Sequence, residues 1–157
     1  MTMDSTTLQR WIGEGYDRRA WHGPNLRVAL RDVKLEEALW RPGPGRHSIW
    51  ELVLHCAYWK HRVTVRVTGV RTKFGRTGAD WPRLPPEPGE SAWRADLALL
   101  EAAHERLLDA CSSAWPARPA SRPGRSPLDQ LVGIAFHDVY HAGQIRLIRR
   151  MYGERAV

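Results

Sequence analysis

Near its C-terminus the chain reads Ile134-Ala-Phe-His-Asp-Val-Tyr-His-Ala-Gly-Gln-Ile145, with His137 and His141 four residues apart. In an α-helix, residues at this spacing lie on the same face, so the two imidazoles can converge on one point. Neutral imidazole nitrogens are common metal ligands. The spacing therefore predicts a helix that carries part of a metal site, with a hydrogen-bonded pair of core histidines as the alternative.

The apolar residues around this pair predict that it faces the interior of the protein. At 100° per residue, His137 and Asp138 lie on opposite margins of one stripe. The stripe comprises Leu131, Ile134, His141, Ile145, Ile148 and Tyr152. Because burying an unsatisfied polar ring costs several kcal/mol, we expect these imidazoles to be hydrogen-bonded or coordinated.

A third ligand should come from a second helix, predicted from Ser48 to Val67. Its apolar face carries Leu52 and Trp59, and His55 lies at the edge between them. His55 is thus the candidate from the residues alone. His104 competes with it, because it falls among the apolar residues of a further predicted helix from Ser91 to Ala114. The remaining histidines, His22, His47 and His61, are placed less favourably.

Length and composition predict one soluble, cytoplasmic domain. A chain of 157 residues is long enough to bury its own core. It contains no apolar run of the ~20 residues that would span a bilayer, and the segment Met1-Thr-Met-Asp-Ser does not resemble a secretory signal. Cys56 and Cys111 each fall on an apolar helical face, which favours buried thiols over a disulfide.

The net charge of +7 raises the possibility of an acidic partner such as nucleic acid. The basic residues, 21 Arg and 3 Lys, are however dispersed among acidic ones, and no nucleic-acid-binding motif accompanies them. They are densest at Arg118, Arg122 and Arg125 and at Arg146, Arg149 and Arg150. We therefore expect a solvated arginine-rich surface and a small-molecule substrate, with no membrane partner.

Gly and Pro divide the chain into helical segments, which predicts an all-α four-helix bundle. After a short helix from Ser5 to Gly13, the first core helix is expected to begin at Pro24. The second begins at Ser48, which forms a capping box with Glu51. The fourth runs from Pro127 to about Tyr152 and ends at Gly153.

The segment from Gly69 to Gly89 shows no helical period and predicts a long loop between the second and third helices. Loops of this length in a compact domain are often functional. If it folds over the bundle, Phe74, Trp81 and Arg83 could line a substrate pocket. The alternative is a solvated connector anchored by a tryptophan.

The second helix carries another apolar line, formed by Trp50, Leu54, Tyr58 and Val65. A helix that is apolar on two sides lies between neighbours. Packing within one bundle explains this line, and so does a symmetric dimer, which we favour.

Two segments carry a family resemblance: Trp40-Arg-Pro-Gly-Pro-Gly-Arg-His-Ser-Ile-Trp-Glu-Leu-Val-Leu-His55 and His137-Asp-Val-Tyr-His-Ala-Gly-Gln-Ile145. They resemble the DinB-like (DinB/YfiT) superfamily of bacterial four-helix-bundle proteins. The resemblance extends from about Trp21 to Gly153. We accordingly expect a single domain over residues 1–157, with its core at about 21–153.

The resemblance implies a divalent metal ion, either zinc, nickel, iron or manganese, held by one histidine of the second helix and two of the fourth. Carried over to this chain, the ligands are His55, His137 and His141, and His104 becomes a neighbour. It also implies a homodimer. Related activities are S-transfer and isomerisation with a low-molecular-weight thiol, mycothiol or bacillithiol, and members are also labelled metal-dependent hydrolases.

Two functions remain as hypotheses. In the first, the chain is a metalloenzyme whose three neutral histidines leave an open metal position, as in catalytic sites. Asp138 is then the candidate catalytic residue, as a base or by orienting a ligand, with Glu51, Tyr140 and Gln144 as further neighbours. In the second, the chain is a non-catalytic, metal-binding stress-response protein with a structural metal.

Overall fold

The computed structural model describes residues 4–113 and 126–155, and every regular element within them is helical. The helices are α1 (Ser5–Tyr16), α2 (Leu26–Ala29), α3 (Leu35–Leu39), α4 (Ile49–Thr68), α5 (Glu90–Ser113) and α6 (Pro127–Glu154). The predicted all-α class is confirmed. The connection 114–125, with Arg118, Arg122 and Arg125, lies outside the described residues.

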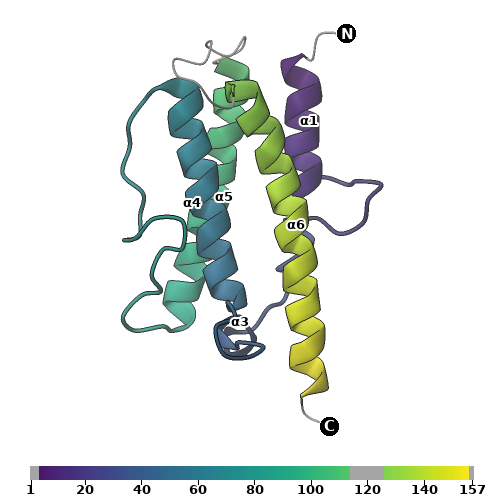
Figure 1. Ribbon diagram of the computed structural model, residues 1–157, viewed down its shortest axis with the longest axis vertical. Coiled ribbons are helices and arrows are strands. Elements are labelled where there is room, and N and C mark those ends of the chain that lie inside the picture. The colour runs from purple at the N-terminus through teal and green to yellow at the C-terminus, as the bar shows by residue number, and fades with distance from the viewer. Residues whose placement is uncertain (1–3, 114–125, 156–157) are drawn as a thin grey trace.

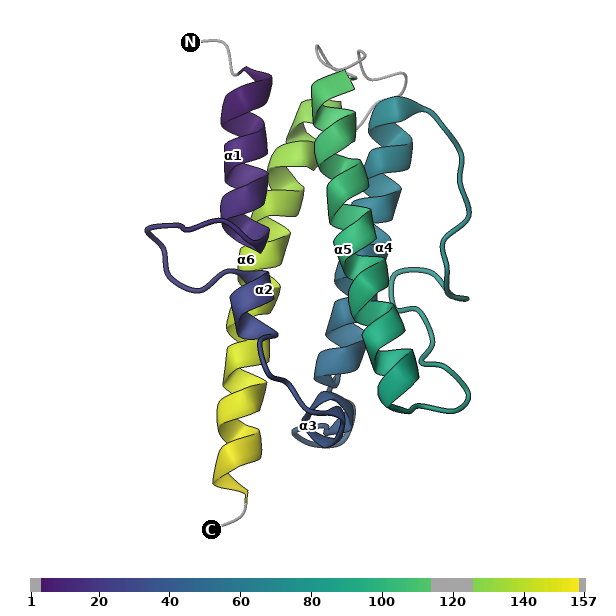
Figure 2. The ribbon, with the colours of Figure 1, turned by 180° about the vertical axis from the view of Figure 1, so that it is seen from behind.

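The four long helices α1, α4, α5 and α6 run side by side and form a bundle (Figure 1). In the reverse view, α5 lies over α4, while α2 lies over α6 below the end of α1 (Figure 2). Contacts join α4 to α5 and α6, and α1 to α5 and α6. Within the described residues, no helix is both long and apolar enough to cross a membrane.

The first helix of the bundle is α1, which corrects the expectation of a core helix beginning at Pro24. Asp4 caps α1 by accepting a hydrogen bond from the amide of Thr7 (2.7 Å), and Leu8 and Ile12 are fully buried. The segment after Pro24 gives only the short helices α2 and α3. Between them Asp32 has φ 60°, a left-handed conformation that a right-handed helix cannot contain.

The start of α4 is as predicted. The Ser48 hydroxyl accepts a hydrogen bond from the amide of Glu51, and the Glu51 carboxylate accepts one from the amide of Ser48. This capping box satisfies two amides that the first helical turn leaves free. It fixes the start of α4, the helix that carries His55.

The N-terminal half of the second apolar line of α4 is covered within the chain, while Tyr58 and Val65 are partly exposed, so the line does not by itself indicate a dimer. Trp50 and Leu54 are fully buried. The indole of Trp50 donates a hydrogen bond to Asp96 of α5 (2.7 Å) and packs against Trp93. Tyr58 contacts Phe74, from the loop between α4 and α5.

Candidate metal centre

Three histidine side chains converge between α4 and α6. His55 lies on α4, and His137 and His141 lie one turn apart on α6. The Nε2 atom of His137 is 3.1 Å from the Nε2 atom of His55 and 3.1 Å from that of His141. Nitrogen ligands on one zinc ion stand roughly 3–3.5 Å apart, since each bond is about 2.0–2.1 Å long. The group has the dimensions of a metal site, and it could hold an ion.

The hydrogen bonds behind these rings determine which nitrogen carries the proton. Nδ1 of His55 is 2.7 Å from the carbonyl oxygen of Asp80, which can only accept, so this nitrogen is the donor. Nδ1 of His141 is 2.6 Å from Oε1 of Gln144, again an acceptor. Both rings therefore present an Nε2 lone pair to the centre of the group. A proton on Nε2 of His137 can satisfy only one of these two lone pairs, whereas a metal cation between the rings satisfies both, so the arrangement fits a metal.

Burial also keeps these histidines neutral. It lowers the pKa of His137 to about 3 and that of His141 to about 4, and it lowers the pKa of His55 as well. The neighbouring imidazoles add to the effect for His137, because two imidazolium ions would repel each other. Since a neutral imidazole is the form that binds metal, the group is ready to coordinate at neutral pH.

The loop 69–89 closes over His55, and in this it partly follows the sequence-based prediction. The ring of Trp81 stacks between His55 and His47, with centroid distances of 4.0 and 3.5 Å. The carboxylate of Asp80 accepts a hydrogen bond from the indole of Trp59 (2.7 Å). Phe74 does not reach the group: its ring packs on Tyr58 and His61, on another side of α4. Arg83 is exposed, and its amide donates a hydrogen bond to the carbonyl of Thr77 within the loop.

Of the other predicted neighbours, Gln144 and Tyr140 support the group and Glu51 does not. Gln144 accepts from His141 and donates through Nε2 to the hydroxyl of Tyr140 (3.1 Å). This second bond fixes the orientation of the amide, so its oxygen faces His141. Glu51 caps α4 and pairs with Arg41 (2.6 Å).

Asp138 is not a member of the three-histidine group and forms an ion pair with Lys60 of α4. Both side chains are fully buried. Burial raises the pKa of Asp138, and the ammonium of Lys60 opposes that shift. We did not predict Lys60 from the sequence. Its position in the sequence is consistent with burial, because this lysine lies between Cys56 and Val63 on the apolar stripe of α4.

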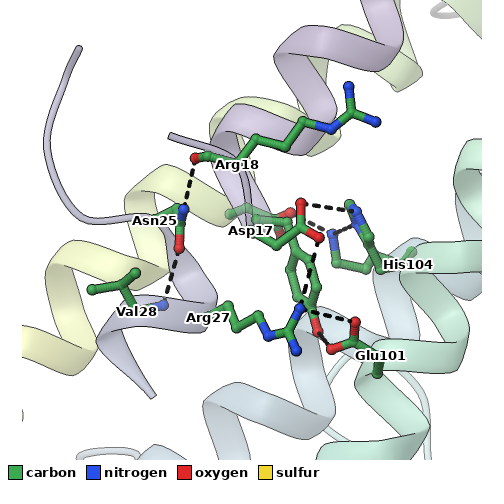
Figure 3. Close-up of polar contacts among 10 residues, drawn as sticks. Asp17, Arg18, Asn25, Arg27, Val28, Glu101 and His104 are labelled. Atoms are coloured by element: carbon green, nitrogen blue, oxygen red, sulfur yellow. Dashed lines mark hydrogen bonds and ion pairs between the residues drawn. The ribbon is translucent and has the colours of Figure 1, made fainter. Parts of the chain in front are cut away.

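His104 is not part of the three-histidine group. Its Nδ1 lies 3.3 Å from the ammonium of Lys60, so it accepts, and the proton is on Nε2, which is 4.0 Å from Asp17. Figure 3 shows His104 beside Asp17, with Arg27 between Asp17 and Glu101. Burial lowers the pKa of His104 to about 3, and Lys60 contributes. His104 therefore acts as a neutral partner of the buried lysine.

A second group, formed by Cys56, His137 and Asp138, also has ligand atoms within 4.8 Å of one another. Its chemistry suits a metal less well. Burial raises the pKa of the Cys56 thiol, so it stays protonated, and the ammonium of Lys60 occupies the carboxylate of Asp138. The three histidines are the better site, because all three are neutral imidazoles and both His55 and His141 hold their proton on Nδ1, which leaves Nε2 to bind an ion.

An all-α bundle with three histidines between two of its helices defines a class of candidate metalloproteins. Within that class, the sequence model of the DinB superfamily matches residues 18–145 of this chain. The chain belongs to the DinB superfamily. No curated protein and no solved structure matches the chain.

Proposed function

We propose that this protein is a divalent-metal-dependent enzyme, with His55, His137 and His141 as the metal ligands. The proposal rests on the position of their Nε2 atoms, because those of His55 and His141 each lie 3.1 Å from that of His137. In His55 and His141 the other ring nitrogen, Nδ1, donates a hydrogen bond, so Nε2 is the atom that can bind an ion. Zinc, nickel, iron and manganese are the candidate ions, since imidazole binds several transition metals. A bound ion would act as a Lewis acid and lower the pKa of a water or thiol that reaches it.

The small number of protein ligands favours catalysis. Among the described residues, the group contains three donors and no fourth side chain. A site with three protein ligands leaves a position for substrate, whereas structural zinc sites have four. The residues around it hold the ligands: Asp80 and Gln144 orient two rings, and Trp81 covers one face of His55. We propose a low-molecular-weight thiol as the substrate of an S-transfer reaction, or a hydrolysable small molecule.

For Asp138, burial and the ion pair with Lys60 support a positioning role better than contact with a substrate. A carboxylate with no exposed surface cannot take a proton from a molecule at the mouth of the site. It is adjacent to His137 in the sequence and fixes α6 against α4. We therefore propose that it holds the two helices, and their ligands, in register.

A structural metal is the alternative, and one observation favours it. The three histidines join α4 to α6, and His55 and His141 are buried, so an ion there would tie two helices of the bundle together. The chain would then be a metal-binding stress-response protein without turnover. Metal binding contributes to folding when the site is absent in the unfolded chain.

Metal content and chelation test both functions. The protein purified from its own host should contain about one ion per chain by elemental analysis, and His141→Ala should lower this well below one. His61→Ala is the matched control, because His61 lies on α4 outside the group. Full occupancy in His141→Ala would contradict the ligand assignment.

After chelation, an enzyme keeps its helical circular dichroism and loses turnover in a screen of thiols and electrophiles. Unfolding on chelation, with no chemistry in the metal-loaded protein, would instead establish the structural role.

We also propose a cytoplasmic homodimer that does not act on nucleic acid. Cys56 and Cys111 are buried free thiols, as expected in a reducing compartment. Several arginines are engaged within the chain: Arg76 with Asp96 and Arg149 with Glu37, both at 2.8 Å. Duplex DNA should therefore bind weakly and without specificity, and tight binding with a steep salt dependence would contradict this.

A further inference from the structure

The outer face of α6 carries exposed apolar side chains at a regular spacing. Phe136, Tyr140 and Leu147 are 68%, 64% and 58% exposed. Gly133 and Gly143 fall on the same face, and a Cβ atom at either glycine would meet open space. The series Gly133, Phe136, Tyr140, Gly143 and Leu147 alternates steps of three and four residues, the spacing of helices that pair along a seam. We call these five residues the α6 seam.

The α6 seam lies away from the bundle. The buried residues of α6, among them Ile134, Asp138 and Ile145, occupy the opposite side of the helix. Contiguous exposed apolar surface of this kind marks an interaction site. The seam, extended to the exposed Met151, is about 27 Å long at roughly 1.5 Å per residue.

The order of large and small residues is self-complementary in an antiparallel pair. With a twofold axis at Tyr140, Leu147 of one copy lies opposite Gly133 of the other. Phe136 then lies beside Gly143. Leu147 and Phe136 each meet a glycine, which leaves room for them as knobs fit holes between packed helices, and the two copies of Tyr140 meet at the axis. A parallel pair would place Phe136 on Phe136 and glycine on glycine.

The charges beside the seam favour the same orientation. Arg146 and Arg150 are exposed near its C-terminal end, and Asp129 is exposed near its N-terminal end. In an antiparallel pair, Arg150 of one copy approaches the end of α6 that carries Asp129 of the other. In a parallel pair the arginines would face their own copies, and like charges at an interface are unfavourable.

We propose that the α6 seam is the surface through which two copies of this chain pair, antiparallel and with the twofold axis at Tyr140. The inference rests on the proposed homodimer and identifies its interface. Tyr140 accepts a hydrogen bond from Gln144, which in turn holds His141. Each three-histidine group therefore lies beside the axis, and the second copy forms part of the approach to it.

Sedimentation of the metal-loaded protein tests the surface. Wild type should have twice the 18.0 kDa mass of the chain. Phe136→Asp and Leu147→Asp should each raise the dimer dissociation constant at least tenfold, because a carboxylate would be buried against an apolar partner. Val70→Asp is the matched control, since Val70 is as exposed but lies outside the seam. A monomeric wild type, or dimers that survive both seam variants, would overturn the proposal.

Cysteine cross-linking tests the orientation. Cys56 and Cys111 are buried, so an introduced surface cysteine reports its own neighbour. Tyr140→Cys should form a disulfide-linked dimer under mild oxidation, whereas Met151→Cys should not, because antiparallel pairing separates the two copies of residue 151. Equal cross-linking of both would indicate a parallel pair and contradict the inference.

Metal content in the same samples separates this inference from the proposed function. A dimer without bound metal would overturn the metal site and leave the seam intact. A metal-loaded monomer would overturn the seam and leave the metal site intact.

Discussion

Lys60 and Asp138 form an ion pair between α4 and α6 in which neither side chain is exposed to solvent. The pair lies next to His137 in the sequence of α6 and beside His104 of α5. A buried pair adds little net stability over an apolar pair of the same size, but loss of one partner leaves an uncompensated charge. The three-histidine group is thus supported by a contact whose two members depend on each other.

Lys60→Met should lower the free energy of unfolding by about 3–5 kcal/mol, because it leaves the Asp138 carboxylate buried without a cation. The double variant Lys60→Met/Asp138→Leu should recover most of this loss. Urea unfolding followed by circular dichroism measures both. Arg94→Met, which breaks an exposed pair with Glu90, should change stability by less than about 1 kcal/mol. Equal losses in the single and double variants would contradict the dependence of Asp138 on Lys60.

Gln144→Leu should weaken metal binding about 10–100-fold, because it removes the acceptor that fixes the ring of His141. Gln144→Glu keeps an acceptor at that position and should bind the metal at least as tightly as wild type. Competition with a chromophoric chelator gives the dissociation constants. If Leu and Glu at this position bind metal equally well, the hydrogen bond to His141 has no role in the site.

Trp81→Ala should release the loop 69–89 from His55 and His47. Each aromatic contact contributes about 0.5–1.5 kcal/mol to holding the loop closed. The Arg83 amide, which donates a hydrogen bond to the carbonyl of Thr77, reports opening of the loop, and its hydrogen exchange should become about tenfold faster or more. Trp21→Ala is the control, because Trp21 is 93% exposed, its ring lies edge-on to that of His22, and the segment between α1 and α2 that carries it lies away from the loop 69–89 (Figure 2). The prediction fails if both variants exchange this amide at the wild-type rate.

His104 should make the protein less stable as the pH falls. Its pKa is about 3 in the folded chain and about 6.5 in the unfolded chain, so below pH 6.5 the unfolded chain binds more protons. Between these two pKa values, His104 should therefore lower the free energy of unfolding by up to about 1.4 kcal/mol for each unit by which the pH falls. Above pH 6.5 it should have no effect on stability. The groups that face it are Lys60, Asp17, Arg18 and Arg27, together with Tyr16, whose ring stacks on His104 at a centroid distance of 3.9 Å.

Stability curves of the metal-free protein measured from pH 7 to pH 4 isolate this contribution. His104→Gln keeps an acceptor for Lys60 and should give a shallower dependence on pH than wild type. His22→Gln is the control, because His22 is exposed. Parallel curves for wild type and His104→Gln would show that His104 does not titrate as the structure indicates.

Much of the candidate metal site could be predicted from the sequence. Helical periodicity predicted that His141 and Asp138 face inward, and both are buried. It also placed His55 on a helix that faces α6. The same reasoning favoured His55 but could not exclude His104 as a further ligand, since both lie at apolar faces and their distance from α6 depends on how the helices pack. It also left Lys60 unremarked, because a lysine on an apolar face indicates burial only once its partner is known.

The sequence alone determined the local structure: the all-α class, the capping box at Ser48, the spacing of His137 and His141 and the long loop after α4. These follow from interactions between residues a few positions apart, which the order of the chain specifies directly. The tertiary structure decided the rest. It made α1 the first bundle helix, buried Trp50 and Leu54 against α5 and the loop, and left α6 with the exposed seam. It also set the 3.1 Å contacts of the three Nε2 atoms, because these depend on the packing of α4 against α6.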